Sequence, residues 1–139
     1  LLSVLYSLKD VDGIQLMWPL PDHIDPATVY NSIDVGKDVD GIHYIGQQEI
    51  LNTSALPPVT PAGTLSLMKH YDIELKNKKV LVIGRSPIVG SPIAHMLRQE
   101  DAIVTVAHSQ VEVEELEKLV TSSDIIVSCA GLPGAIRAE

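Results

Sequence analysis

The chain has 139 residues, of which 45% are hydrophobic and 20% are charged, and its formal net charge is −8. This length fits about one domain with a real core, and the composition excludes disordered, collagen-like and low-complexity proteins. The acidic balance argues against a nucleic-acid-binding surface, the single cysteine excludes a disulfide scaffold, and no apolar run is long enough to span a membrane.

The first part of the chain carries most of the negative charge and is expected to form its own lobe. We expect a helix over residues 1–9, a strand over 13–18 and a further helix that opens at Asp25. Asp before Pro26, at the first helical position, is a strong start signal. The chain opens without an initiator methionine and stops at Glu139 without a closing element, so we expect a fragment of a longer protein.

A proline-rich passage over residues 56–61 separates this lobe from the rest. Proline fixes φ and holds the preceding residue in extended conformations, so a continuous element is not expected there. We therefore expect two lobes, residues 1–58 and residues 59–139. The second is expected to begin with a helix from about Pro61 to Tyr71, capped by Thr60.

The second lobe alternates between strand and helix patterns. Short apolar runs predict strands at 80–83, 103–106 and 124–129, and amphipathic spacing predicts helices over 89–99 and 113–120. Strand, helix, strand, helix, strand is the order of a parallel sheet with right-handed crossovers. The fold class is therefore predicted to be α/β.

A glycine-containing loop, residues 84–90, joins the first of these strands to its helix. Dinucleotide-binding proteins place a glycine-rich turn here, with backbone amides and the helix N-terminus facing a pyrophosphate. The spacing is Gly84-x-Ser86-x-x-x-Gly90, which differs from the common G-x-G-x-x-G pattern. An ordinary glycine turn in an α/β protein is the alternative.

The end of the second strand bears on the choice of dinucleotide. An NAD-binding protein places an acidic residue about 20 positions after the first glycine to hold the ribose hydroxyls. Residues 107–110 carry no acid, whereas Arg85 and Ser109 can contact a 2′-phosphate. This favours NADP over NAD, and the alternative is that Arg85 is a solvated loop residue.

Other candidate sites are weaker. In the segment 37–41, Asp38 and Asp40 alternate, so one is expected to face a cleft, where an Asp can bind an aminopyrimidine-like edge. An acidic turn with a salt-bridged Lys37 is the alternative. The five histidines show no metal-ligand spacing, so no metal site is expected, and Cys129 is expected to be buried and inert.

Several motifs occur in a fixed order along the chain: 13–21 (GIQLMWPLP), 37–41 (KDVDG), 58–63 (PVTPAG), 84–90 (GRSPIVG), 104–109 (VTVAHS) and 131–134 (GLPG). Together they resemble the bifunctional methylenetetrahydrofolate dehydrogenase/methenyltetrahydrofolate cyclohydrolase family over essentially the whole chain. The resemblance implies an α/β catalytic lobe of which residues 1–58 are part. It also implies a linker helix and a partial Rossmann-type NADP lobe over residues 59–139.

The resemblance also implies roles for particular residues. Asp40 matches the aspartate that holds the pterin ring of the tetrahydrofolate substrate. Gly84, Arg85 and Ser86 match the NADP loop, and Ser109 matches a serine near the 2′-phosphate. The family's catalytic lysine would precede the first residue of this chain. A homodimer is implied as well, and the sequence leaves the location open between the cytoplasm and the mitochondrion.

One departure from the family concerns catalysis. The family places glutamine two residues before Pro19, beside its lysine, whereas this chain has Met17 there and Gln15 two positions earlier. Gln15 and Asp40 are therefore the candidate catalytic residues. The implied reaction is NADP-dependent oxidation of methylenetetrahydrofolate, followed by hydrolysis to 10-formyltetrahydrofolate. The alternatives are a different Rossmann dehydrogenase, or a degenerate paralogue that binds NADP or dimerises without turnover.

Overall fold

The computed structural model describes residues 2–17, 19–41 and 56–131. The chain divides into two compact units, Leu1–Val59 and Thr60–Glu139. Within the described residues, no helix is both long enough and apolar enough to cross a membrane.

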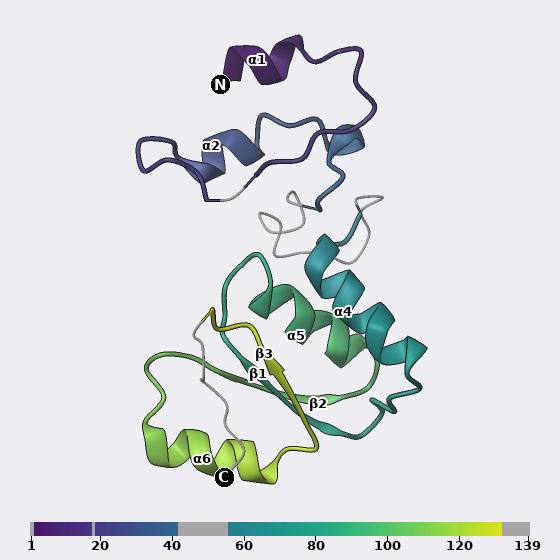
Figure 1. The fold of residues 1–139 in the computed structure, drawn as a ribbon, viewed down its shortest axis with the longest axis vertical. Helices are drawn as coiled ribbons and strands as arrows, with labels where there is room; N and C mark the ends of the chain where they lie inside the picture. Colours follow the sequence, from purple (N-terminus) through teal and green to yellow (C-terminus); the bar gives the residue numbers. More distant parts are fainter. Residues whose placement is uncertain (1, 18, 42–55, 132–139) are drawn as a thin grey trace. The chain divides into compact units, whose positions relative to one another are not determined.

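The second unit is built on a parallel sheet of three strands, β1 (Lys79–Ile83), β2 (Ile103–Ala107) and β3 (Ile125–Ser128). Their order is β2-β1-β3, so the first strand lies in the middle (Figure 1). The last four residues of β1 are buried, because helices cover both faces of a parallel sheet and leave little of its central strand in water. The α/β fold class with a parallel sheet is confirmed.

Helices cover the two faces of this sheet unequally. Helices α4 (Val59–His70) and α5 (Gly90–Gln99) pack against one face, and α6 (Val113–Ser122) packs against the other (Figure 1). The larger apolar cluster lies under α4 and α5, and its fully buried members include Val80, Val82, Ile93 and Leu97. The two faces meet at β1, whose Leu81 belongs to the smaller cluster under α6.

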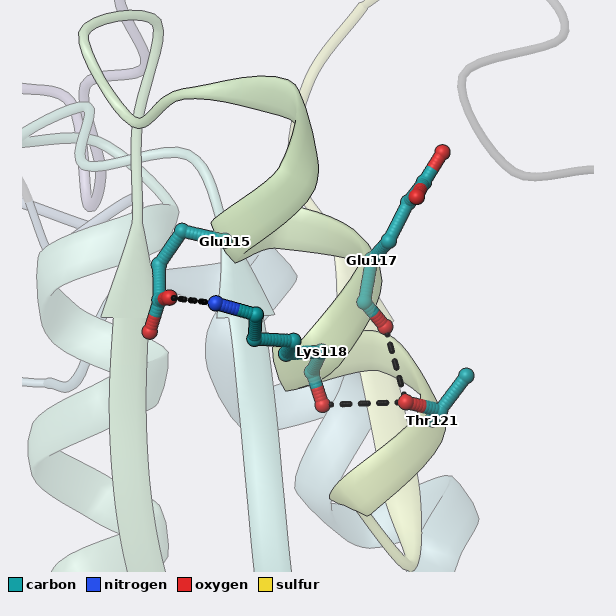
Figure 2. A network of polar contacts seen from close by, with 4 residues as sticks. All are labelled: Glu115, Glu117, Lys118 and Thr121. Atoms are coloured by element: carbon teal, nitrogen blue, oxygen red, sulfur yellow. Dashed lines mark hydrogen bonds and ion pairs between the residues drawn. The ribbon is translucent and has the colours of Figure 1, made fainter.

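Helix α6 shows how an amphipathic pattern divides between core and solvent. Leu116, Leu119 and Val120 pack against the smaller apolar cluster, as their spacing predicts. Val113 is 66% exposed because it lies in the first turn, beyond the edge of the sheet contact. The outer face carries an ion pair between Lys118 and Glu115 at 3.3 Å and a Thr121 hydroxyl that donates to backbone carbonyls one turn back (Figure 2). Such exposed pairs contribute little to stability.

Helix α4 begins earlier than the sequence suggests. It starts at Val59, so Thr60 lies in its first turn and is not the cap that the sequence predicts. Pro61 is tolerated near the start because the first-turn amides of a helix have no partner within it. Leu65 is buried, whereas Leu67 is 58% exposed and does not share the apolar side.

The first unit contains α1 (Leu2–Ser7), α2 (Pro26–Tyr30) and the short 3-10 helix η1 (Val35–Lys37). The predicted start of α2 is confirmed, because the Asp25 carboxylate accepts the Thr28 amide at 2.9 Å. A hydrogen bond from the Thr28 hydroxyl, and after it the bond from the Thr28 amide, lower the pKa of Asp25.

The predicted strand over 13–18 is wrong for the part that the structure describes. Among residues 13–17, only Ile14 pairs with another segment, through an isolated parallel bridge to Asp38. The Ile14 amide donates to the Lys37 carbonyl at 2.7 Å, and the Val39 amide donates back to the Ile14 carbonyl at 3.5 Å. The partner segment leaves a 3-10 turn at this point, so the ladder does not extend and no strand forms.

Candidate functional site

The loop that follows β1 begins at Gly84, where the three parallel strands end. Gly84 has a φ of +114, in the region that favours glycine. Its amide donates to the Ala107 carbonyl at the end of β2 (2.8 Å), and the Cys129 amide donates to the Ile83 carbonyl (2.7 Å). A Cβ on Gly84 would lie 3.1 Å from the Cys129 carbonyl carbon. The backbone angle therefore requires glycine here, and the space beside Cys129 is tight for any side chain.

The other end of the loop is Gly90, the first residue of α5. A Cβ built on Gly90 would lie 2.3 Å from the carbonyl oxygen of Gly84 and 3.0 Å from the Cα of Arg85. The start of the helix therefore lies directly against the start of the loop. Only glycine at position 90 allows the helix start and the loop start to lie this close together. The two ends of the loop are therefore in contact, and we call it the closed glycine loop.

Ser86 joins the loop to the helix by hydrogen bonds. Val89, at the N-cap position, supplies no side-chain bond. The Ser86 hydroxyl oxygen accepts the amides of Val89 (3.2 Å) and Gly90 (3.3 Å), and its carbonyl accepts the Ser91 amide (3.0 Å). A hydroxyl that accepts two amides still has its own proton to donate. Ser86 thus offers a donor at the positive end of α5.

Arg85 and Ser109 leave the sheet at the same edge. Ile83 and Ala107 are register partners at the ends of β1 and β2, and each candidate residue follows two positions later. Neighbouring strands lie about 4.8 Å apart, so the two loops start side by side. Both side chains are exposed. This edge presents a guanidinium and a hydroxyl, with no carboxylate among residues 107–110.

The first unit brings two of the predicted residues together. Gln15 lies beside the Asp40 carboxyl and acts to lower its pKa, but partial burial and then the charge of Asp38 outweigh this effect and raise the Asp40 pKa. Tyr30 belongs to the same group, because burial and then the charge of Asp40 raise its pKa. Tyr30 lies at the end of α2, and no motif in the sequence indicates that it belongs to this group.

Asp38 is the more deeply buried of the two alternating acids. It is only 4% exposed, and its carboxylate accepts the Asp40 amide at 3.2 Å. Lys37 donates to the backbone carbonyls of Leu8 (2.9 Å) and Lys9 (2.7 Å). The segment is therefore held by its own side chains, with Asp38 inside and Asp40 half-buried.

Met17 and Cys129 are both more exposed than the sequence suggests. Met17, which falls within the predicted strand over 13–18, is 74% exposed and is not part of a strand. Cys129 follows β3 and is half-buried, and burial raises its pKa and disfavours the thiolate. Trp18 and residues 132–134 of the last motif lie outside the described residues. No cluster of three possible metal ligands occurs in the parts of the chain that the structure describes.

Comparison with known families decides the relationship of the chain. The family model described as "Tetrahydrofolate dehydrogenase/cyclohydrolase, NAD(P)-binding domain" matches residues 58–139, more than half of the chain. The chain belongs to the tetrahydrofolate dehydrogenase/cyclohydrolase family. The resemblance inferred from the ordered motifs is confirmed.

Curated relatives in this family match the chain from end to end. The "Bifunctional protein FolD" of Zymomonas mobilis is 44% identical over 140 residues, and the match covers 100% of this chain and 46% of that protein. The protein of the same name from Thermus thermophilus is 39% identical over 139 residues, covering 99% of this chain and 49% of its own length. The chain spans about half the length of the curated relatives it matches.

Solved structures of tetrahydrofolate dehydrogenase/cyclohydrolases have the same fold. The Campylobacter jejuni FolD methylenetetrahydrofolate dehydrogenase/cyclohydrolase gives a TM-score of 0.82 at 35% identity, covering 98% of this chain and 48% of its own. The Trypanosoma brucei enzyme, complexed with NADP and an inhibitor, gives 0.84 at 34% identity, covering 96% and 46%. Both are mixed α/β proteins, in agreement with the predicted fold class.

Proposed function

We propose that this chain is part of an NADP-dependent methylenetetrahydrofolate dehydrogenase with methenyltetrahydrofolate cyclohydrolase activity. Residues 59–139 supply the linker helix and part of the cofactor lobe, and residues 1–58 supply part of the catalytic lobe. The observation that carries the proposal is the closed glycine loop between β1 and α5, in a chain that belongs to this family. Tetrahydrofolate derivatives are the proposed substrates, and a homodimer is the proposed assembly.

The residues present fit a bound dinucleotide. Gly84 and Gly90 allow the tight loop that brings the start of α5 against the end of β1, which is the arrangement that faces a pyrophosphate in dinucleotide-binding proteins. Ser86 offers a hydroxyl proton at the positive end of α5, which favours an anion. Arg85 and Ser109 at the sheet edge suit a 2′-phosphate, because a guanidinium binds phosphate through paired charge-assisted hydrogen bonds.

The first unit would hold the substrate. NADP supplies the hydride acceptor when bound, and the chain's contribution is to place the one-carbon group against it. Asp40 offers two acceptor oxygens to the amino edge of a pterin. Its raised pKa reflects partial desolvation, and Gln15 lies beside the carboxyl and opposes that rise. Gln15 thereby acts as a positioning residue for Asp40.

We predict that Asp40→Asn removes turnover in the full protein and leaves NADP affinity unchanged. The amide replaces one acceptor oxygen by a donor and breaks the match to the pterin edge. Turnover is measured by the absorbance of NADPH and methenyltetrahydrofolate, and NADP affinity by titration calorimetry. Asp34→Asn is the matched control: it lies in the same segment, and asparagine can keep its bond to the Gly36 amide, so activity should stay normal.

The same variant has a predicted effect on stability. The folded-state pKa of Asp40 is raised, so its contribution to stability is complete below the ordinary pKa and is lost as pH rises through the raised pKa. At pH 7, Asp40→Asn should therefore be at least as stable as the parent in chemical denaturation. Normal turnover, or a stability loss that explains the lost turnover, would contradict the role given to Asp40.

Two alternatives give different outcomes in these assays. A protein that binds NADP but does not convert methylenetetrahydrofolate would be the degenerate paralogue. A protein that reduces NADP with another alcohol or amine substrate and ignores folates would be a different dehydrogenase. The proposed function requires a folate-dependent signal that disappears with Asp40→Asn.

A further inference from the structure

Ser91 has a contact that the cofactor proposal does not use. It lies in the first turn of α5, and its hydroxyl donates to the backbone carbonyl of Arg85 at 3.2 Å. Its amide donates to the carbonyl of Ser86 at 3.0 Å. Through these two bonds, one helical residue holds two consecutive peptide groups of the loop.

Within the described residues, the backbone at Arg85 is fixed by few other contacts. Arg85 is exposed and follows Gly84, whose φ of +114 lies in a region where glycine alone moves freely. The register of β1 and β2 fixes the loop only up to Ile83 and Ala107. Beyond that point, the loop backbone lies against Gly90. The Ser91 hydroxyl is bonded directly to the Arg85 carbonyl.

A fixed backbone at Arg85 matters only to a ligand that the arginine contacts. Ordering a long side chain on binding costs affinity, and holding its backbone beforehand reduces that cost. The benefit should appear for a dinucleotide with a 2′-phosphate and should be absent for one without it, because the guanidinium has nothing to bind there.

We propose that Ser91 is a positioning residue that fixes Arg85 and thereby contributes to the preference for NADP over NAD. The proposal rests on the proposed function, in which Arg85 contacts the 2′-phosphate. In this proposal Ser91 acts only through Arg85, because its hydroxyl is bonded to the Arg85 carbonyl.

The test is a set of dissociation constants for NADP and NAD, measured by calorimetry on the full protein and its variants. Ser91→Ala should weaken NADP binding roughly three- to tenfold, the size expected for one lost hydrogen bond, and change NAD binding less than twofold. Ser91→Thr keeps the hydroxyl and should restore most of the NADP affinity. Ser122→Ala is the matched control, since it removes a serine hydroxyl bonded to the Leu119 carbonyl at 3.3 Å near the end of α6.

A double-mutant cycle separates positioning from general loop damage. In an Arg85→Ala background, Ser91→Ala should change NADP affinity less than twofold, because the residue it positions is gone. Equal weakening of NADP and NAD by Ser91→Ala, or an undiminished effect in the Arg85→Ala background, would overturn the proposal. A parent chain that binds neither dinucleotide would contradict the proposed function itself.

Discussion

Gly90→Ala is expected to lower the free energy of unfolding of the second unit by about 2–3 kcal/mol, a typical cost of forcing extra atoms into a tight contact. The new methyl group would lie 2.3 Å from the Gly84 carbonyl oxygen. Neither partner can move away freely, because both are backbone at the junction of β1 and α5. The shift should also open the loop and weaken NADP and NAD binding together.

Gly63→Ala is the matched control for this prediction. Gly63 is also a helical glycine, but a Cβ built there would meet no atom within 4 Å. Alanine at an open helical position should raise the free energy of unfolding by about 0.5–1 kcal/mol. Opposite signs for the two substitutions in chemical denaturation would support the closed loop. A neutral Gly90→Ala variant with normal dinucleotide affinity would show that the loop has room there.

Arg85→Ala is expected to weaken NADP binding by roughly 10- to 150-fold, which corresponds to about 1.5–3 kcal/mol for a charge-assisted contact. NAD binding should change little, because NAD lacks the 2′-phosphate. The measurement is the pair of dissociation constants for each protein at one fixed ionic strength, since charge contacts are screened by salt.

Arg98→Ala provides the control for charge alone. Arg98 is an exposed arginine in the last turn of α5, at the opposite end of the helix from the loop. Its removal changes the net charge by the same amount and should leave both dissociation constants unchanged. Equal losses for NADP and NAD in Arg85→Ala would contradict a contact to the 2′-phosphate.

The sequence predicts the second unit well because its signals are local. Short apolar runs and helical spacing place β1, α5, β2, α6 and β3 within one or two residues of their observed bounds. The glycines at the two ends of the loop are also visible in the sequence. The hydroxyl bonds of Ser86 and Ser91 are not, because serine is common in loops and its partners depend on how the loop closes.

The first unit is predicted less well because its structure depends on contacts between distant segments. Residues 13–17 have a strand-like pattern, but only Ile14 finds a pairing partner. Two alternating acids, Asp38 and Asp40, look equivalent in the sequence, and the buried position of Asp38 follows from the turn that ends η1. Tyr30 lies near Asp40 only because the chain folds back on itself, which the sequence does not indicate.

The most direct test is a calorimetric titration of NADP and of NAD, under identical conditions, into the full protein that contains this chain. The closed glycine loop and the Arg85 and Ser109 edge predict that both dinucleotides bind at one site per chain. NADP should bind at least about tenfold more tightly, the lower end of the effect of one charge-assisted contact. No binding of either dinucleotide, or an affinity for NAD equal to that for NADP, would contradict this account.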